Sequence, residues 1–265
     1  MPPTSKEGFY LSRFRLPGKR ALVTGGGRGI GLACAEALAE AGAEICVADV
    51  DPAITEQGLA ALRAKGYAAR SVALDVTDAA AVTKTADSLA ADWGTVDILI
   101  CNAGIARSNT RAEDVTDEHW RNVIDVNLNG VFWCCRAFGR HMLRAGRGAI
   151  VNVGSMSGFI VNRPQPQSYY NASKAAVHQL TRSLAAEWAP RGVRVNAVAP
   201  TYINTPLNRF VESDPAMAAA WLGGTPMGRM GEPEEIASVV LFLASDASSL
   251  MTGSVVLADG GYTCW

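Results

Sequence analysis

The residues with the clearest potential for chemistry are a tyrosine and a lysine four positions apart, Tyr170 and Lys174. In a helix, side chains at this spacing share one face, so a phenol and an ammonium would meet. A free phenol has a pKa near ~10, and a cation about 4 Å away at intermediate dielectric contributes roughly 4 kcal/mol, or about 3 pK units. Tyr170 would then work as a base near neutrality. Tyr169 is the alternative base, but it lies roughly a third of a turn off the face of Lys174.

A glycine-rich run follows the first predicted strand and leads directly into a helix: Thr24-Gly25-Gly26-Gly27-Arg28-Gly29-Ile30-Gly31. Its spacing is T-G-x-x-x-G-x-G, because Ile30 stands where the G-x-G-x-x-G pattern needs its last glycine. Glycines allow a tight turn and a close approach to a pyrophosphate, and the helix N-terminus offers free N–H groups and a positive dipole end. The run therefore predicts a dinucleotide site.

Polar residues also follow the next predicted strands. Asp49 can accept hydrogen bonds from adenosine ribose hydroxyls and would repel a 2′-phosphate, which favours NAD over NADP; the alternative is a solvated carboxylate at a strand end. Arg28 favours the opposite preference, since a cation in the loop can meet that phosphate. Asp75 either accepts from the adenine amino group or serves the turn that follows it. The run Asn102-Ala103-Gly104 either admits a flat ligand or ties two strand ends together.

The elements that must carry these residues alternate between short apolar runs and longer helical patterns. Strands are predicted at Arg20–Thr24, Glu44–Ala48, Ala68–Leu74, Val96–Cys101, Gly148–Val153, Arg194–Ala199 and Ser254–Leu257. They are mostly apolar, as expected of parallel strands buried on both faces. Helices are predicted at Ile30–Ala41, Pro52–Ala64, Asp78–Asp92, Asp117–Ala145 (two helices, or one with a break), Tyr169–Trp188 and Glu232–Ala244. This alternation predicts an α/β fold: a single-domain, Rossmann-like, doubly wound sheet of about seven parallel strands with helices on both faces.

The 265 residues are expected to form one domain (1–265), with residues 1–15 as a flexible arm and residues 201–229 as a substrate loop. A net charge of −1 without a basic cluster argues against a nucleic-acid partner. The chain shows neither a signal-peptide core nor an apolar run of membrane-spanning length, so a cytoplasmic protein without membrane contact is expected. The six cysteines are interpreted as reduced thiols, most of them in apolar runs, and the histidines have no metal-ligand spacing.

Six motifs occur in an order that resembles the short-chain dehydrogenase/reductase family. They are TGGGRGIG (24–31), CNAG (101–104), VNLNG (126–130), GSMSG (154–158), YNASK (170–174) and RVNAVAP (194–200). The resemblance extends from about Leu16 to the end of the chain, where DGGYT (259–263) also fits. Together these motifs are highly specific.

The resemblance implies interconversion of a secondary alcohol and a ketone with NAD(H). Tyr170 would exchange the alcohol proton, Lys174 would hold the nicotinamide ribose and lower the pKa of Tyr170, and Ser155 would hydrogen-bond the substrate oxygen. Asn127 would kink its helix and hold a water in a proton relay. The cofactor contacts expected from the motifs and the resemblance are Gly25, Arg28, Gly29, Ile30, Gly31, Asp49, Asp75, Val76, Asn102, Ala103, Gly104, Tyr170, Lys174, Pro200, Ile203 and Thr205.

The loop before Tyr170 suggests a substrate class. Its hydroxyl and amide groups suit a hydroxyl-rich substrate, because buried polar groups left unpaired are costly. The segment GSMSGFIVNRP and the length of the loop look similar to sugar-alcohol dehydrogenases of the galactitol type, which implies a polyol or vicinal diol as substrate. The expected substrate contacts are Ser155, Ser157, Asn162 and Tyr170, with Arg163 and Gln165 on the same loop.

Two other functions stay open. One is an NADPH-dependent reductase of 3-oxoacyl thioesters on acyl carrier protein, against which Asp49 argues. The other is a non-catalytic NAD(H)-binding scaffold, against which the intact set of Asn127, Ser155, Tyr170 and Lys174 argues.

The chain departs from the family pattern at Thr201, where a glycine commonly follows the proline, and a β-branched residue resists a positive φ. The resemblance also implies a homo-oligomer, usually a tetramer, with a dimer interface on Val126–Phe138 and Tyr170–Trp188. The segment Tyr262–Trp265 would pack against a partner subunit, where some relatives bind Mg²⁺ through a terminal carboxylate. Trp133, Trp188 and Trp221 are expected to be core or subunit contacts rather than ligand platforms.

Overall fold

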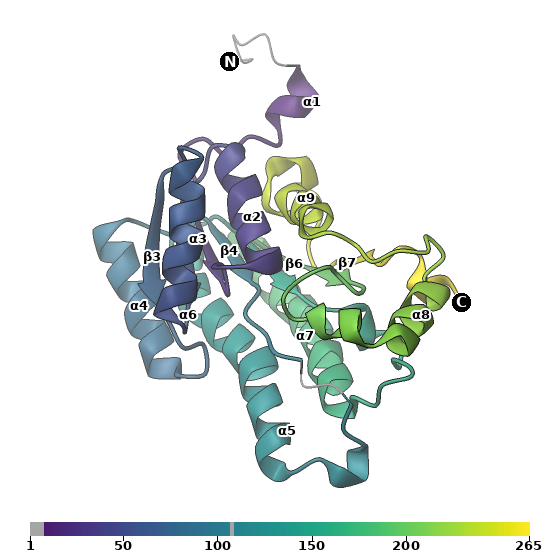
Figure 1. Ribbon diagram of the computed structural model, residues 1–265. Coiled ribbons are helices and arrows are strands. Elements are labelled where there is room, and N and C mark those ends of the chain that lie inside the picture. Colours follow the sequence, from purple (N-terminus) through teal and green to yellow (C-terminus); the bar gives the residue numbers. More distant parts are fainter. Residues whose placement is uncertain (1–7, 107–108) are drawn as a thin grey trace.

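Seven parallel strands form the centre of the molecule in the order β3-β2-β1-β4-β5-β6-β7 (Figure 1). The computed structural model describes residues 8–106 and 109–265. The strands are β1 (Arg20–Thr24), β2 (Glu44–Asp49), β3 (Ala69–Ala73), β4 (Ile98–Cys101), β5 (Gly148–Val153), β6 (Val193–Pro200) and β7 (Val255–Ala258). The predicted fold class is confirmed, and the strand ends differ from the predicted ones by two residues at most. The order reverses between β1 and β4, which is where doubly wound sheets bind ligands.

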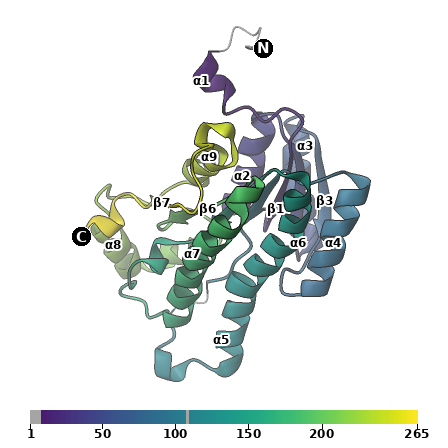
Figure 2. The same cartoon turned by 180° about the vertical axis from the view of Figure 1, so that it is seen from behind.

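Helices cover both faces of this sheet. Successive residues of a strand point to opposite faces, so Val23 of β1 packs into one core cluster and Leu22 into the other. The first face carries α2 (Gly29–Glu40), α3 (Pro52–Ala64) and α9 (Pro233–Ala244). The second face, seen from behind in Figure 2, carries α4 (Ala79–Asp92), α6 (Gly130–Ala145) and α7 (Ser168–Trp188).

The long predicted helix 117–145 is two helices joined without a loop. α5 (Asp117–Ile124) passes through a π-helical turn (Asp125–Asn129) into α6. π-helical turns are rare and frequently accompany functional sites. The expected break therefore exists, and it contains Asn127.

The N-terminal segment falls partly outside the described residues, since positions 1–7 of the expected arm are not among them. α1 (Phe9–Ser12) stands apart from the sheet (Figures 1 and 2). From Arg13 onward the chain is hydrogen-bonded to the rest of the fold. The Arg13 guanidinium donates to the carbonyl of Asp246, and the Leu16 backbone N–H donates to the carbonyl of Ala41.

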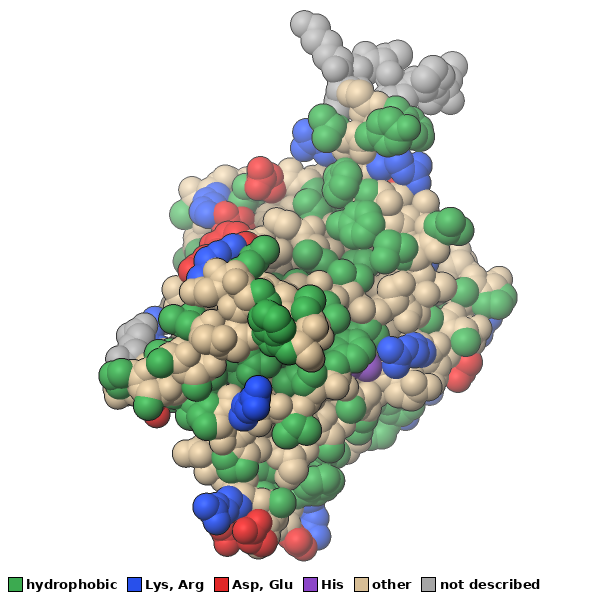
Figure 3. All heavy atoms as spheres, turned by 90° about the vertical axis from the view of Figure 1, so that its right-hand side faces the viewer, with side chains coloured by type: hydrophobic (Ala, Val, Ile, Leu, Met, Phe, Trp, Pro, Cys, Tyr) green, Lys and Arg blue, Asp and Glu red, His purple; other side chains and the backbone are tan. Residues whose placement is uncertain are grey.

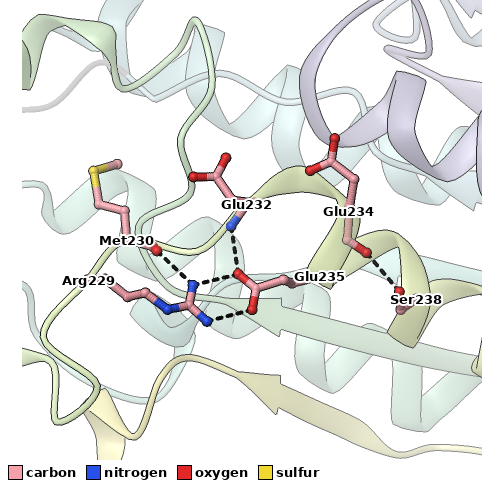
Figure 4. Close-up of polar contacts among 6 residues, drawn as sticks. All are labelled: Arg229, Met230, Glu232, Glu234, Glu235 and Ser238. Carbon is pink, nitrogen blue, oxygen red and sulfur yellow. Dashed lines mark hydrogen bonds and ion pairs between the residues drawn. The ribbon is translucent and has the colours of Figure 1, made fainter.

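The segment between β6 and α9 leaves the sheet, forms α8 (Pro215–Gly224) and returns. Its two ends are joined at the base, because Ile203 pairs with Gly231 in a parallel bridge. Figure 4 shows how the returning end is bound to α9: the Arg229 guanidinium donates to both carboxylate oxygens of Glu235 at 2.7 Å. Glu235 also accepts the backbone N–H of Glu232, which caps α9. These bonds lower the pKa of Glu235 to about 2.

Three further findings concern predictions made from composition. Within residues 8–106 and 109–265, no helix combines the length and apolar character required to cross a membrane. All six cysteines are free thiols, and only Cys264 is exposed. Burial raises the pKa of Cys34 and Cys46 to about 12.

Candidate active site

A cavity of about 370 Å³ opens along the carboxyl ends of the strands, from the glycine loop to α8. Most residues predicted to bind cofactor or substrate line it. These are Gly25, Arg28, Gly29, Ile30, Asp49, Asp75, Val76, Asn102, Ala103, Gly104, Ser155, Ser157, Asn162, Tyr170, Lys174, Pro200 and Thr205. Asn127, Gly31 and Ile203 do not line the cavity.

The glycine loop makes one end of this cavity. Gly25 and Gly29 have φ of 60° and 54°, which non-glycine residues rarely adopt. A Cβ on Gly25 would lie 3.0 Å from both the Cα of Ala103 and the amide nitrogen of Asn102, so the loop needs a glycine there. Arg28, at the N-cap of α2, makes no side-chain cap to the helix. The N–H groups of the first turn remain available to an anion, which fits a pyrophosphate.

Two expected cofactor contacts, Gly31 and Ile203, do not reach the cavity surface. A Cβ on Gly31 would collide with the carbonyl of Gly25 and the amide of Asn102, so Gly31 lets α2 pack closely behind the loop. Ile203 is buried in the core, and its carbonyl accepts the Asn208 amide at 2.9 Å. Both residues shape the cavity from behind rather than from its surface.

The acidic and amide residues at the strand ends make contacts that bear on the alternatives left open by the sequence. Asp49, at the end of β2, is half-buried and lines the cavity. Asp75 serves the following turn, because its Oδ1 accepts both the N–H and the hydroxyl of Thr77, yet it also lines the cavity. The amide of Asn102 donates to the carbonyls of Thr24 and Gly25 and thereby ties β4 to β1.

Tyr170, Ser155 and Lys174 come together near the middle of the cavity. α7 presents Tyr170 and Lys174 on one face, as their spacing predicts, and Ser155 follows β5. The hydroxyls of Tyr170 and Ser155 are hydrogen-bonded. The Lys174 ammonium lies 5.7 Å from the centre of the Tyr170 ring. Tyr169 is fully buried against the His119 ring at 4.4 Å and does not line the cavity.

The pKa of Tyr170 is shifted by burial and by Ser155, and Lys174 is not among the causes of the shift. Lys174 donates to the carbonyl of Val153 at 2.9 Å, at the end of β5. Burial raises the pKa of Tyr170 above its ordinary value, and the Ser155 hydrogen bond opposes that shift. Burial also lowers the pKa of Lys174 to about 8.

Asn127 lies behind the cavity wall, in the π-helical turn. Its Oδ1 accepts the Ile105 N–H at 2.8 Å, and its amide donates to the Ile105 carbonyl and the Ser173 hydroxyl. Oδ1 and both amide hydrogens therefore have protein partners. The side chain braces the segment after β4 against α7.

The end of the cavity beside α8 is lined by a buried polar network and an aromatic wall. Tyr202 and Trp221 stack with ring centres 3.8 Å apart. The Tyr202 hydroxyl accepts from the side-chain amides of Asn162 and Gln165, and the Trp221 indole donates to the side-chain oxygen (Oε1) of Gln165. Tyr202, Trp221 and Gln167 also line the cavity, which no sequence motif predicts; Arg163 is exposed and does not line it.

Trp221 was expected to be a core or subunit contact, and it is both buried and a wall of the cavity. Only its position in the segment 201–229 could have indicated this, since helical periodicity does not distinguish the two roles. Thr201 has no positive φ, so the turn after Pro200 accommodates a β-branched residue. Its hydroxyl is buried without a hydrogen-bond partner among the described residues.

Metal ligands are not assembled in the described part of the chain: no three His, Cys, Asp or Glu side chains are grouped to hold an ion. Near the C-terminus, the Asp259 carboxylate accepts hydrogen bonds from the N–H groups of Gly261 and Thr263 and so stabilises the turn that follows β7.

Comparisons with known proteins agree with this geometry. Residues 25–263 match the profile of the family described as Enoyl-(Acyl carrier protein) reductase. A galactitol 2-dehydrogenase from Rhizobium johnstonii is 60% identical over 256 residues, covering 97% of this chain and 99% of that protein. The crystal structure of gox2181 superimposes with a TM-score of 0.96 at 54% identity, covering 97% of this chain and 100% of that one. A gluconate 5-dehydrogenase from Burkholderia cenocepacia J2315, solved in complex with NADP and tartrate, has a TM-score of 0.92 at 39% identity, covering 96% and 99%.

Proposed function

The chain belongs to the short-chain dehydrogenase/reductase family, and on that premise we propose that it oxidises a secondary hydroxyl of a polyol to a ketone. The observation that carries the proposal is the hydrogen-bonded pair of Tyr170 and Ser155, with Lys174 beside it, in a cavity continuous with the glycine loop. The relatives named above that act on galactitol and gluconate make a polyhydroxylated substrate the first choice.

A nicotinamide dinucleotide fits the residues of the glycine end. The positive-φ glycines and the uncapped N-terminus of α2 suit a pyrophosphate, and Asp49 stands where ribose hydroxyls need an acceptor. When bound, the nicotinamide supplies the hydride acceptor. We infer NAD rather than NADP, because the Asp49 carboxylate would repel a 2′-phosphate more effectively than the exposed Arg28 would attract it.

The chain's own residues would handle the proton. In the oxidation direction the deprotonated Tyr170 oxygen takes the hydroxyl proton, while the C–H bond of the same carbon breaks and its electron pair leaves with the hydrogen as hydride. Ser155 holds the substrate oxygen by a hydrogen bond. Lys174 keeps a positive charge close to the Tyr170 oxygen. At pH 7 most Lys174 side chains are protonated, because the pKa of the ammonium is about 8.

The substitution Tyr170→Phe tests the assignment. Without the Tyr170 hydroxyl, no enzyme group is left to accept the proton from the substrate hydroxyl. We therefore expect kcat to fall about 10²–10⁴-fold while the affinity for the cofactor stays similar. The assay is NADH formation with hexitols, pentitols and vicinal diols. Oxidation at a near wild-type rate would contradict the role of Tyr170, and absence of turnover by the wild type across the panel would reject the polyol class.

The cofactor preference is tested at Asp49. Asp49→Ser removes the charge that disfavours a 2′-phosphate, and we expect the ratio of kcat/KM for NAD over NADP to fall about tenfold, the equivalent of about 1.4 kcal/mol. The exposed Asp51, whose carboxylate caps α3, is a nearby acidic position, so Asp51→Ser is the control. A wild-type enzyme that prefers NADP would overturn the assignment.

The same assays separate the remaining functions. A 3-oxoacyl-thioester reductase would turn over acetoacetyl thioesters with NADPH faster than any polyol, whereas a scaffold would bind NADH without turnover. We further propose a cytoplasmic homotetramer. The buried free thiols of Cys34, Cys46, Cys101, Cys134 and Cys135 suit a reducing compartment.

A further inference from the structure

His178 lies one helical turn after Lys174 and is not absorbed by the mechanism above. Its ring is 2% exposed and is enclosed by the turn that carries Ser155. A Cβ on Gly154 would lie 2.5 Å from the ring Nε2, and a Cβ on Gly158 would collide with the ring Cε1. The ring of Phe159 packs against the imidazole with centres 4.6 Å apart. The histidine therefore fills the space between the two glycines on either side of Ser155.

The ring also holds the backbone of Ser155 directly. The Ser155 N–H donates to Nε2 of His178 at 3.5 Å. Since Nε2 accepts, the proton of the neutral ring belongs on Nδ1. That nitrogen is buried and has no hydrogen-bond partner among the described residues. A buried donor without a partner is a cost in stability that calls for an explanation.

Burial and the neighbouring charges keep the ring neutral. Burial lowers the pKa of His178 to about 4, and the like charges of Lys174 and Arg182 on α7 add to the shift. The ring is then neutral at pH 7 and can accept at Nε2. A charged ring would donate at both nitrogens and lose the Ser155 N–H.

We propose that His178 is a positioning residue for the reaction, whose neutral ring fixes the turn at Ser155 so that the Ser155 hydroxyl stays hydrogen-bonded to Tyr170. The proposal rests on the proposed function, because it assigns His178 an effect only through Ser155. The Ser155 hydroxyl is held by Ser157 and Tyr170. Its Oγ accepts the Ser157 N–H at 3.1 Å, is hydrogen-bonded to the Ser157 hydroxyl at 3.1 Å, and bonds to Tyr170. Loss of the ring would free the backbone that supports these contacts.

A double-mutant cycle tests this coupling. His178→Leu keeps an apolar filling but cannot accept the N–H, whereas His178→Gln places a carbonyl oxygen near the position of Nε2. We expect His178→Leu to lower kcat for polyol oxidation at least tenfold with KM for the cofactor unchanged within threefold. His178→Gln should stay within threefold of wild-type kcat. In a Ser155→Ala background, His178→Leu should lower kcat by less than a further twofold.

The controls separate positioning from folding. Gln179→Leu changes the exposed neighbour on α7 and should leave kcat unchanged. If His178→Leu does not fold, His178→Asn replaces it, since its carbonyl is one bond too short to reach Ser155. Equal losses in both backgrounds, or a glutamine variant no better than leucine or asparagine, would overturn the proposal. Wild-type activity of Ser155→Ala alone would contradict the proposed function itself.

Discussion

Lys174 shows how far a single residue can be predicted from spacing. Periodicity placed it on the face of Tyr170, and the structure agrees, because α7 is regular there. Its partner, the carbonyl of Val153, comes from β5 and depends on how α7 packs on the sheet. Asn127 is similar, since its motif marked it but its contacts to Ile105 and Ser173 bring distant segments together. Local patterns identify a site residue, whereas tertiary packing decides which atom it bonds.

The burial of Lys174 has a consequence for stability that can be measured. The folded protein holds this ammonium with a pKa of about 8, against 10.5 for the unfolded chain. Between these values the unfolded state binds more protons, so the contribution of Lys174 to stability increases as pH rises from 8 to 10.5. At pH 7 the buried charge costs about 3 kcal/mol. Lys174→Met should therefore raise the free energy of unfolding at pH 7 by about 2 kcal/mol, after loss of one hydrogen bond, while abolishing turnover.

Urea denaturation of the cofactor-free protein at pH 7 and pH 9.5, with a reductant present, measures the effect. The advantage of the methionine variant should shrink at the higher pH, where the wild-type lysine is largely neutral. Lys84→Met on the exposed side of α4 is the matched control and should show no such advantage. A methionine variant less stable than wild type at pH 7 would contradict the cost assigned to the buried charge.

At the scale of elements, the strands and most helices follow from apolar patterning, and the exceptions have physical reasons. The π-helical turn at Asp125–Asn129 contains no proline or other helix-breaking residue. The length of the helical pattern 117–145 predicted a break, but no local residue predicted that the break is a π-helical turn. The excursion 201–229 has weak periodicity, and its order depends on ties to distant residues, such as Gln165 to Trp221. Its place at the carboxyl edge of the sheet predicted a substrate loop, but its aromatic wall could not be predicted from local sequence.

Arg194 is the clearest single tie between elements. From β6 its guanidinium donates to the carbonyls of Leu243, Ser245 and Met251 and to the Ser248 hydroxyl. These carbonyls belong to the C-terminal end of α9 and the segment after it, where acceptors lack partners within the helix and a cation is favourable.

Arg194→Met should therefore destabilise the protein by about 3 kcal/mol, because three carbonyls lose their donor. Arg194→Lys should recover only a minor part, since one ammonium cannot reach all four acceptors. Urea denaturation is the measurement, with Arg191→Met at an exposed neighbouring position as the control. A lysine variant as stable as wild type would mean that the charge alone, and not the fork of donors, holds α9.

At the scale of the whole molecule, apolar surface remains uncovered on one side. Figure 3 shows hydrophobic side chains gathered over the face that α8 and the C-terminal end occupy. Exposed apolar side chains on the C-terminal segments include Met227, Leu250, Leu257 and Trp265, of which Leu250 is 99% exposed. Leu257 belongs to β7, an outer strand of the sheet. An uncovered apolar edge strand invites pairing with another chain, so this side is suited to the subunit contact of the proposed tetramer.

Charged substitutions on this side should therefore split the assembly without unfolding the chain. Leu250→Glu together with Leu257→Lys places charges where apolar contact is expected, and light scattering should show the tetramer replaced by dimers, because the proposed interface on α6 and α7 stays intact. Val50→Glu is the control, since Val50 is also exposed but lies beside β2 on the other half of the sheet. A double variant that keeps its tetrameric mass would show that the subunit contact lies elsewhere. A wild type that is monomeric at all concentrations would contradict the inference that this apolar face binds another subunit.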